Sequence, residues 1–261
     1  MENNSVLYSV KDGICDIVWN QPEKLNPMNT ATIQGLTEAF TKAGEDENVR
    51  VIIVSGAGRA FSAGGDIGQM LGGTEAADNP GIDLTDVQNL IRLMRNTPKP
   101  IIAAIHGPAA GGGCNFALAC DMAICAENTK FIEAFVNIGL TPDTAGVYTL
   151  PRIIGTSRAF EFMASGRVMR ADEALQLGIV NEVVPTEKVM ERAHEIAAKY
   201  AAGPTKSYAM LKKMINASMF AGMDEFFKTE WSAVNEASKT EDFHEGMKAF
   251  VEKRPAKFQG K

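Results

Sequence analysis

Two glycine-rich turns are the features of this sequence whose composition most directly indicates chemistry. Residues 61–66 read Phe-Ser-Ala-Gly-Gly-Asp, and residues 107–113 read Gly-Pro-Ala-Ala-Gly-Gly-Gly. Each turn follows a predicted strand and precedes a predicted helix, where small residues let the backbone approach a ligand and the first helical N–H groups lack partners within the helix. Two such turns that face each other could direct two N–H donors at one carbonyl oxygen and form an oxyanion hole. The same glycines could instead serve only tight packing of helix against strand.

The glycine patterns that bind nucleotides are absent from both turns. Neither turn reads G-x-G-x-x-G, the dinucleotide-binding pattern, and the chain has no G-x-x-x-x-G-K-[ST] phosphate-binding loop. The 26 Lys and Arg against 32 Asp and Glu give a net charge of −6, which disfavours nucleic acid because phosphate neutralisation needs clustered basic residues. The sequence therefore points away from a Rossmann or P-loop nucleotide site and from nucleic-acid partners.

Short buried strands that alternate with helices must position the two turns. An alternating segment with a turn at Gly13 predicts a β-hairpin over residues 6–18, and apolar β-branched runs predict further strands. Such alternation favours an α/β fold with a mostly parallel sheet covered by helices. The predicted strands are 51–55, 100–106, 122–126 and 179–184; the predicted helices are 31–43, 87–95, 114–120, 159–164, 171–177, 187–202, 205–218, 224–237 and 242–252; residues 74–86 are predicted to be a surface excursion.

The remaining composition describes an ordinary globular chain. With 261 residues and 45% hydrophobic residues, one large domain with a small appendage is expected. The four cysteines, Cys15, Cys114, Cys120 and Cys125, fit no zinc-ligand spacing, so free buried thiols are expected. A polar N-terminus unlike a signal peptide and the lack of a bilayer-length apolar run predict a cytoplasmic protein without membrane contact.

Both glycine turns lie within longer segments that resemble the signatures of the crotonase (enoyl-CoA hydratase/isomerase) superfamily. Residues 60–67 read Ala-Phe-Ser-Ala-Gly-Gly-Asp-Ile, and residues 99–107 read Lys-Pro-Ile-Ile-Ala-Ala-Ile-His-Gly before a Gly-Gly-Gly-Cys run. The likeness extends over residues 26–258. It implies a ββα spiral core over residues 1–200 and a C-terminal helical region, residues 201–261, that forms trimers within a homo-hexamer.

The resemblance also implies a substrate and a site. The substrate would be an acyl-CoA thioester, so coenzyme A would be part of the substrate, and neither a separate cofactor nor a metal is implied. The backbone N–H groups of Gly65 and Gly112 would form the oxyanion hole. Lys24 and Lys253 match basic positions of the family near the coenzyme A phosphates, although either could be a solvated surface lysine. The backbone around Ala63 would contact adenine.

The side chains that decide the reaction differ from those of the family's hydratases. The two glutamates that hold water in hydratases fall at Asn115 and Phe135, so ordinary hydration is disfavoured. Asp143 stands where hydratases have glycine, within a stretch that resembles the enoyl-CoA isomerase group to which 1,2-epoxyphenylacetyl-CoA isomerase belongs. One carboxylate suits moving a proton between C2 and C4 of an enoyl thioester. Asp143 could alternatively be a turn residue after Pro142.

Other readings remain open at this point. The superfamily's 4-chlorobenzoyl-CoA dehalogenase also has an Asp-Thr-Ala stretch like residues 143–145, with the Asp as nucleophile. It has a Trp at the position of Phe135 and a His in the helix before the second signature, whereas residues 87–95 contain no His. A non-enzymatic RNA-binding member is a further alternative. We expect Glu133 at the surface or in a hydrogen bond, and His106 in a packed or hydrogen-bonded role.

Overall fold

A six-stranded sheet forms the centre of the described part of the chain. The structure is a computed structural model that describes residues 4–70 and 84–261. Strands β1 and β2 form the predicted antiparallel hairpin, and the other neighbours pair in parallel, which confirms the α/β prediction. In sheet order the strands are β1 (Val6–Lys11), β2 (Ile14–Trp19), β4 (Val51–Gly56), β6 (Ile101–Ile105), β8 (Met122–Ala126) and β11 (Glu182–Val184).

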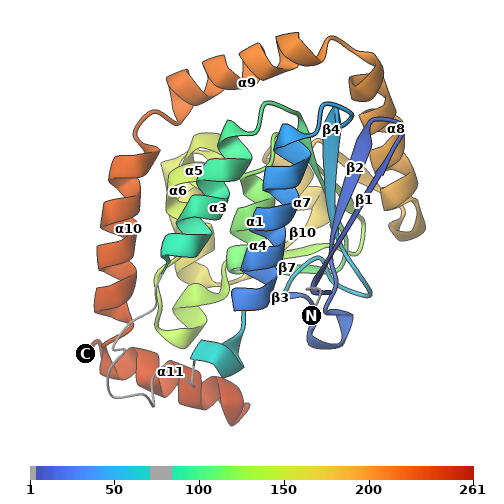
Figure 1. The fold of residues 1–261 in the computed structure, drawn as a ribbon. Coiled ribbons are helices and arrows are strands. Elements are labelled where there is room, and N and C mark those ends of the chain that lie inside the picture. Colours follow the sequence, from blue (N-terminus) through green and yellow to red (C-terminus); the bar gives the residue numbers. More distant parts are fainter. Residues whose placement is uncertain (1–3, 71–83) are drawn as a thin grey trace.

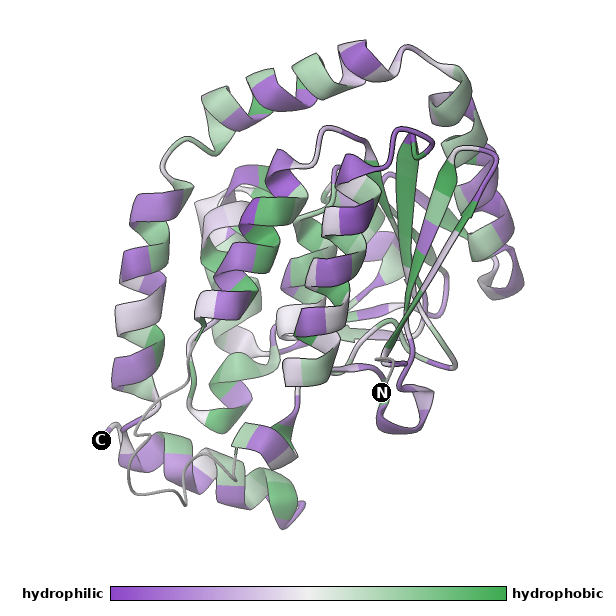
Figure 2. Cartoon of the chain, in the orientation of Figure 1, coloured by the Kyte–Doolittle hydropathy of each residue, from purple (hydrophilic) through white to green (hydrophobic). Residues whose placement is uncertain are grey.

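Helices cover both faces of this sheet (Figure 1). On one face, α8 (Val189–Ala202) packs its small residues against the strands, with Ala193 and Ala197 touching the cluster that contains Ile53 and Ile102. The neighbouring strand residues Ile52 and Val54 point to the other face and join the main core. Because β4 is buried on both faces, its residues 51–54 are all hydrophobic, and the strand is green over most of its length in Figure 2.

Helices close the main core on the second face. Among them are α1 (Thr30–Glu45), α3 (Thr85–Asn96), α4 (Gly112–Leu118), α5 (Gly146–Ile154) and α6 (Thr156–Ser165). In Figure 1, α1 and α3 stand beside one another in front of α4. All four cysteines are buried and free, which confirms that prediction.

Two small sheets carry the glycine turns. One contains β10 (Val168–Arg170), β9 (Lys130–Ile132) and β7 (Pro108–Ala110), in that order. The other pairs β3 (Pro27–Met28) with β5 (Gly64–Gly65). The second glycine turn therefore begins as a strand, β7, rather than as the simple loop expected from its composition.

The chain behind the core is helical, as predicted. Apart from α5 and α6, its helices are α7 (Ala171–Gln176), α8, α9 (Thr205–Met219), α10 (Met223–Ala237) and α11 (Glu241–Val251), and short 3₁₀ turns are η1 (Pro22–Lys24), η2 (Ala134–Ile138) and η3 (Thr186–Lys188). Figure 1 shows α9, α10 and α11 running along three sides of the core. Two of the predicted boundaries were wrong. Residues 85–86 were predicted to lie in the surface excursion but belong to α3. Strand β11 was predicted from residue 179 but begins at Glu182, because Ile179 and Val180 lie in a buried turn. The rest of the predicted excursion, residues 74–83, lies outside the described residues.

Buried charges attach α9 to the sheet. Lys212 on α9 is only 6% exposed, and its Nζ donates to Asp121 Oδ2 (2.8 Å) and to the carbonyl of Met94 (2.9 Å). Arg95 contacts the other Asp121 oxygen at 3.4 Å. Because each buried charge has a partner of opposite sign, α9 is held in one register along the core. Within residues 4–70 and 84–261, no helix is long and apolar enough to cross a membrane.

Candidate active site

The two glycine-rich turns lie side by side. Ser62 donates its backbone N–H to the carbonyl of Pro108 (3.1 Å), and Ala110 donates its own to the carbonyl of Ser62 (2.9 Å). Gly64 has φ +87°, and a Cβ built on it would lie 2.6 Å from the carbonyl oxygen of Ala110 and 3.5 Å from Gly111 Cα. A side chain at Gly64 would force the turns apart, so this glycine is required for their contact.

Each turn carries one backbone N–H that faces away from its strand partner or begins a helix. Asp66 donates its N–H to the carbonyl of Met28 across the β3–β5 pair (3.3 Å), and successive amides of an extended strand point in opposite directions, so the Gly65 N–H faces away from β3. Gly112 is the first residue of α4, whose first helical bond runs from the Asn115 N–H to the Gly111 carbonyl. The Gly112 N–H therefore belongs to the first-turn donors that a helix cannot pair internally.

Asp143 lies directly beside the second turn. A Cβ built on Gly112 would be 3.7 Å from Asp143 Oδ1 and 3.1 Å from Thr144 Oγ1. The Thr144 hydroxyl donates to Asp143 Oδ1 at 2.7 Å. Burial raises the pKa of Asp143 to about 6, and the Thr144 hydrogen bond offsets part of that rise. A carboxylate with this pKa is ionised at neutral pH and close enough to neutrality to exchange a proton with a carbon acid.

A strained turn holds the Asp143 backbone. Thr144 and Ala145 both have left-handed conformations, with φ 55° and 59°, although neither is glycine. Such conformations cost roughly 1–3 kcal/mol each and persist only where the surroundings enforce them. The carbonyl of Asp143 accepts from the Gly146 N–H (2.9 Å) and from Asn115 Nδ2 (2.8 Å).

Asn115 and Phe135, which occupy the positions of the two hydratase glutamates, border the same site. Asn115 is fully buried, and its amide holds the Asp143 turn through the hydrogen bond to the main chain. The Phe135 ring, 7% exposed, packs over the second turn, with Cζ 3.6 Å from a Cβ built on Gly111. Phe135 also belongs to an apolar cluster with Leu140, against which Met70 packs. These two positions therefore contribute an amide and an apolar wall instead of two carboxylates.

Glu133 was expected at the surface or in a hydrogen bond, and the structure supports the second of these. Its side chain is fully buried, just after the end of β9 and before η2. Glu133 Oε2 lies 3.5 Å from Asn115 Nδ2, and Oε1 has no hydrogen-bond partner within the described residues. Burial, reinforced by the charge of Asp143, raises the pKa of Glu133 to about 8.

Glu230 is a site residue that the sequence reasoning missed. It lies on α10, is 3% exposed, and accepts from the Ala145 N–H at Oε1 (2.8 Å) and from Gln88 Nε2 at Oε2 (3.0 Å). Burial raises its pKa to about 7, and the negative charge of Asp143 adds to this. A signal was present: Phe227 and Val234, three residues before and four after Glu230, are the buried positions of α10, so the acid occupies the apolar stripe of the helix.

The remaining predicted residues lie at the surface or outside this cluster. Lys24 is exposed at the end of η1. The carbonyl of the next residue, Leu25, accepts a hydrogen bond from the N–H of the exposed Ala63 (2.8 Å), so Lys24 and Ala63, both predicted to contact coenzyme A, lie on neighbouring segments. Lys253 is exposed just after α11. His106 donates from Nε2 to the carbonyl of Gly58 (2.9 Å), which confirms its predicted hydrogen-bonded role.

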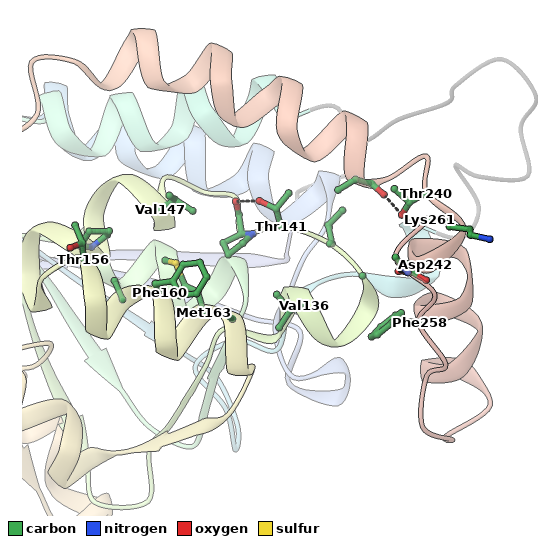
Figure 3. Close-up of a pocket in the computed structure, with 18 residues that line it drawn as sticks. Val136, Thr141, Val147, Thr156, Phe160, Met163, Thr240, Asp242, Phe258 and Lys261 are labelled. Atoms are coloured by element: carbon green, nitrogen blue, oxygen red, sulfur yellow. Dashed lines mark hydrogen bonds between the residues drawn. The ribbon is translucent and has the colours of Figure 1, made fainter.

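A separate apolar cavity of about 750 Å³ opens near the C-terminal helices (Figure 3). It is lined by residues of η2, α5 and α6, including Met163 and Phe160, and by the end of the chain at Phe258. The cavity reaches Thr141 and Pro142 but Asp143 is not among its lining residues. We therefore place the candidate active site at the glycine turns, where the polar groups converge, and not in this cavity.

A model of the enoyl-CoA hydratase/isomerase family matches residues 9–261. The chain belongs to this family. The resemblance to the crotonase superfamily and its α/β fold is thereby confirmed, and the protein is an enzyme of a family that acts on acyl-CoA thioesters.

Relatives in this family carry both isomerase and hydratase names. The chain is 33% identical over 271 residues to the trans-2-decenoyl-acyl-carrier-protein isomerase of Streptococcus mutans, covering 100% of both chains. It is 33% identical over 258 residues to the 1,2-epoxyphenylacetyl-CoA isomerase of Escherichia coli, covering 98% of both. Among solved structures, an enoyl-CoA hydratase from Mycobacterium avium subsp. paratuberculosis matches with a TM-score of 0.88 and 30% identity over 98% of each chain.

Proposed function

We propose that this enzyme is an enoyl-thioester isomerase that moves a carbon–carbon double bond with Asp143 as its single acid and base. The observation that carries the proposal is the position of the Asp143 carboxylate, beside Gly112 at the junction of the two glycine turns. The two hydratase glutamate positions hold Asn115 and Phe135, so the site offers one proton-transfer group where a hydratase uses two.

In the proposed reaction the thioester carbonyl of a 3-enoyl substrate accepts hydrogen bonds from the N–H groups of Gly65 and Gly112. Asp143 removes a proton from C2, and the electron pair delocalises over C2 to C4 and onto the carbonyl oxygen as a dienolate. The two N–H donors stabilise the developing negative charge. The protonated Asp143 then returns the proton at C4, which leaves the double bond between C2 and C3. No atom is gained or lost, so the step needs no co-reactant.

The same geometry argues against hydration. Adding water needs a second group that positions the water and moves its proton. Asn115 Nδ2 is committed to the Asp143 carbonyl, and an amide cannot accept a proton from water at neutral pH. Phe135 provides an apolar ring. Glu133 is fully buried behind Asn115, so it does not present a carboxylate to solvent.

Contacts to the coenzyme A part are proposed from the surface residues. Lys24 and Ala63 lie on neighbouring segments, and we assign them to the adenosine end of the substrate, with Lys253 as a further cation for its phosphates. Coenzyme A enters as part of the substrate, so no separate cofactor is assigned. Because the Streptococcus mutans relative is named for an acyl-carrier-protein substrate, the same acyl group should be tested on both thioester carriers.

The decisive experiment replaces Asp143 with Asn and follows conversion of 3-enoyl, 2-enoyl and aryl-halide CoA thioesters by mass spectrometry. Asn is nearly isosteric but cannot shuttle a proton, so isomerisation should fall roughly 100- to 10,000-fold while thioester binding persists. Asp12→Asn is the matched control, because Asp12 is exposed on the hairpin turn and its left-handed backbone suits Asn.

Three outcomes would contradict the proposal. A fully active Asp143→Asn would move the chemistry to another group, with Glu133 the next to replace. Preferred hydration of the 2-enoyl thioester would identify a hydratase. Halide release with an aryl ester on Asp143 would identify the dehalogenase reaction.

A further inference from the structure

We propose that Glu230 is the positioning residue of Asp143, so that helix α10 completes the active site from the C-terminal region. The proposal rests on the proposed function of Asp143. The contact that carries it spans 85 residues: the Ala145 N–H, two residues beyond Asp143, donates to Glu230 Oε1 at 2.8 Å in a buried environment.

The backbone at this contact needs external support. Thr144 and Ala145 are consecutive non-glycine residues in the left-handed region, so the turn would relax toward other conformations if it were free. Any such relaxation would rotate the Asp143 carboxylate, because Thr144 holds Asp143 Oδ1 through its hydroxyl. Glu230 anchors the second of the two strained residues.

Glu230 is itself held in place. Gln88 of α3 donates to Glu230 Oε2 (3.0 Å) and to the carbonyl of Phe227 on α10 (3.0 Å). At the surface, Arg92 of α3 pairs with Asp224 of α10 at 2.6 Å. Both Glu230 oxygens therefore have donors, and α3 fixes the register of α10. Burying the Glu230 carboxylate in the apolar stripe of α10 removes it from water, which is unfavourable. The hydrogen bonds to its two oxygens offset this desolvation.

The proposal predicts a loss of turnover rather than of binding. In Glu230→Ala the Ala145 N–H loses its acceptor and the turn can shift, while the glycine turns that bind the thioester are unchanged. A displacement on the order of 1 Å can cost about 100-fold in rate, so we expect kcat to fall about 10- to 100-fold with KM nearly unchanged. Glu230→Gln retains an acceptor oxygen for Ala145 and should keep most of the activity.

The experiment measures kcat, KM and melting temperature for Glu230→Ala, Glu230→Gln and Ala145→Gly in the isomerase assay. Glycine adopts the left-handed conformation without strain, so adding Ala145→Gly to Glu230→Ala in a double variant should restore part of the kcat lost in Glu230→Ala alone. Glu225→Ala is the matched control, because Glu225 is exposed on the same helix and pairs only with Lys228 in the described structure. Its kcat should equal that of the wild type.

If Glu230→Ala does not fold, Glu230→Asp replaces it, because the shorter side chain cannot reach Ala145. Wild-type kcat in folded Glu230→Ala or Glu230→Asp overturns the proposal. Equal losses in the Gln and Ala variants also overturn it, because the retained acceptor would then not matter. Asp143→Asn is measured alongside. If Asp143→Asn is inactive and Glu230→Ala is fully active, only the role of Glu230 fails; if Asp143→Asn is fully active, the proposed function itself fails.

Discussion

At the scale of single residues, the site is defined by three carboxyl groups that gather in a poorly solvated region. Asp143, Glu230 and Glu133 have pKa values raised by burial to about 6, 7 and 8. Carboxylates this close cannot all ionise at low cost, so the most solvent-accessible of them, Asp143, ionises first. In the proposed mechanism this order makes Asp143 the base and leaves the two glutamates as its buried surroundings.

The raised pKa of Asp143 predicts a pH dependence with a definite sign. Proton removal from C2 needs ionised Asp143, so kcat/KM for isomerisation should be full above the pKa and fall as the pH drops through about 6. An unperturbed Asp would place this loss near pH 4. The measurement is a rate profile between pH 4.5 and 8.5, with circular dichroism at each pH to exclude unfolding. Activity that stays constant down to pH 4.5 would show that the base is not a buried carboxyl.

At the scale of elements, the N-terminus of α4 is where the second glycine turn, Asp143 and Met28 meet. A Cβ on Gly112 would lie 2.7 Å from Met28 Sδ and 3.1 Å from Thr144 Oγ1. The Met28 sulfur lies near the end of a flexible side chain and can move, whereas Thr144 belongs to the strained turn. Position 112 therefore matters for two reasons. The approach of its neighbours leaves little room for a side chain, and its backbone N–H, which any residue except proline would supply, is a first-turn donor of the helix.

Comparing two substitutions at Gly112 separates these reasons. Gly112→Pro deletes the N–H at a helix position that tolerates proline, and it should lower kcat about 100- to 1,000-fold. Gly112→Ala keeps the N–H and should cost clearly less. Gly44→Ala, at a helix position with contacts no closer than 3.9 Å, is the control and should leave kcat unchanged. Folding is checked by circular dichroism. A folded Gly112→Pro with wild-type kcat would exclude Gly112 as a donor.

At the scale of the whole molecule, the C-terminal helices expose large apolar side chains. On α9, Met210, Leu211, Met214 and Ile215 are 42–63% exposed, and Trp231 on α10 is 46% exposed. The outer turns of α9 in Figure 2 accordingly include green segments. Contiguous apolar surface of this kind is typical of a subunit interface. The resemblance to the superfamily implies a hexamer of two trimers, and we propose that α9–α11 form the trimer contacts.

Light scattering at micromolar concentration tests this assembly. A hexamer would have six times the 28.1 kDa mass of the chain. Met214→Glu places a charge on the exposed face of α9 and should yield smaller species, whereas Thr41→Glu introduces the same charge on the exposed side of α1 and should leave the mass unchanged. A wild-type protein that remains a monomer would refute the proposal.

The sequence by itself predicted most of the main elements and the family, and it singled out Asp143 as the acid that we propose. Strand β8 coincides with the predicted residues 122–126, and α1 and α9 differ from their predictions by at most two residues at either end, because hydrophobic period and turn residues are local signals. The two glycine turns that contain Gly65 and Gly112 could be singled out because close backbone approach leaves a local trace in composition. Asp143 followed from its place in a family-like stretch.

The tertiary structure alone decided how these parts support one another. Glu133 was expected at the surface or in a hydrogen bond, and only the fold shows that it is fully buried with Asn115 as its partner. Glu230 reaches Ala145 across 85 residues, and that contact depends on how α10 packs against α3 and the Asp143 turn. Local spacing can place an acid on the apolar stripe of a helix. It cannot specify which distant backbone N–H the acid will meet, because that pairing is set by the packing of the whole core.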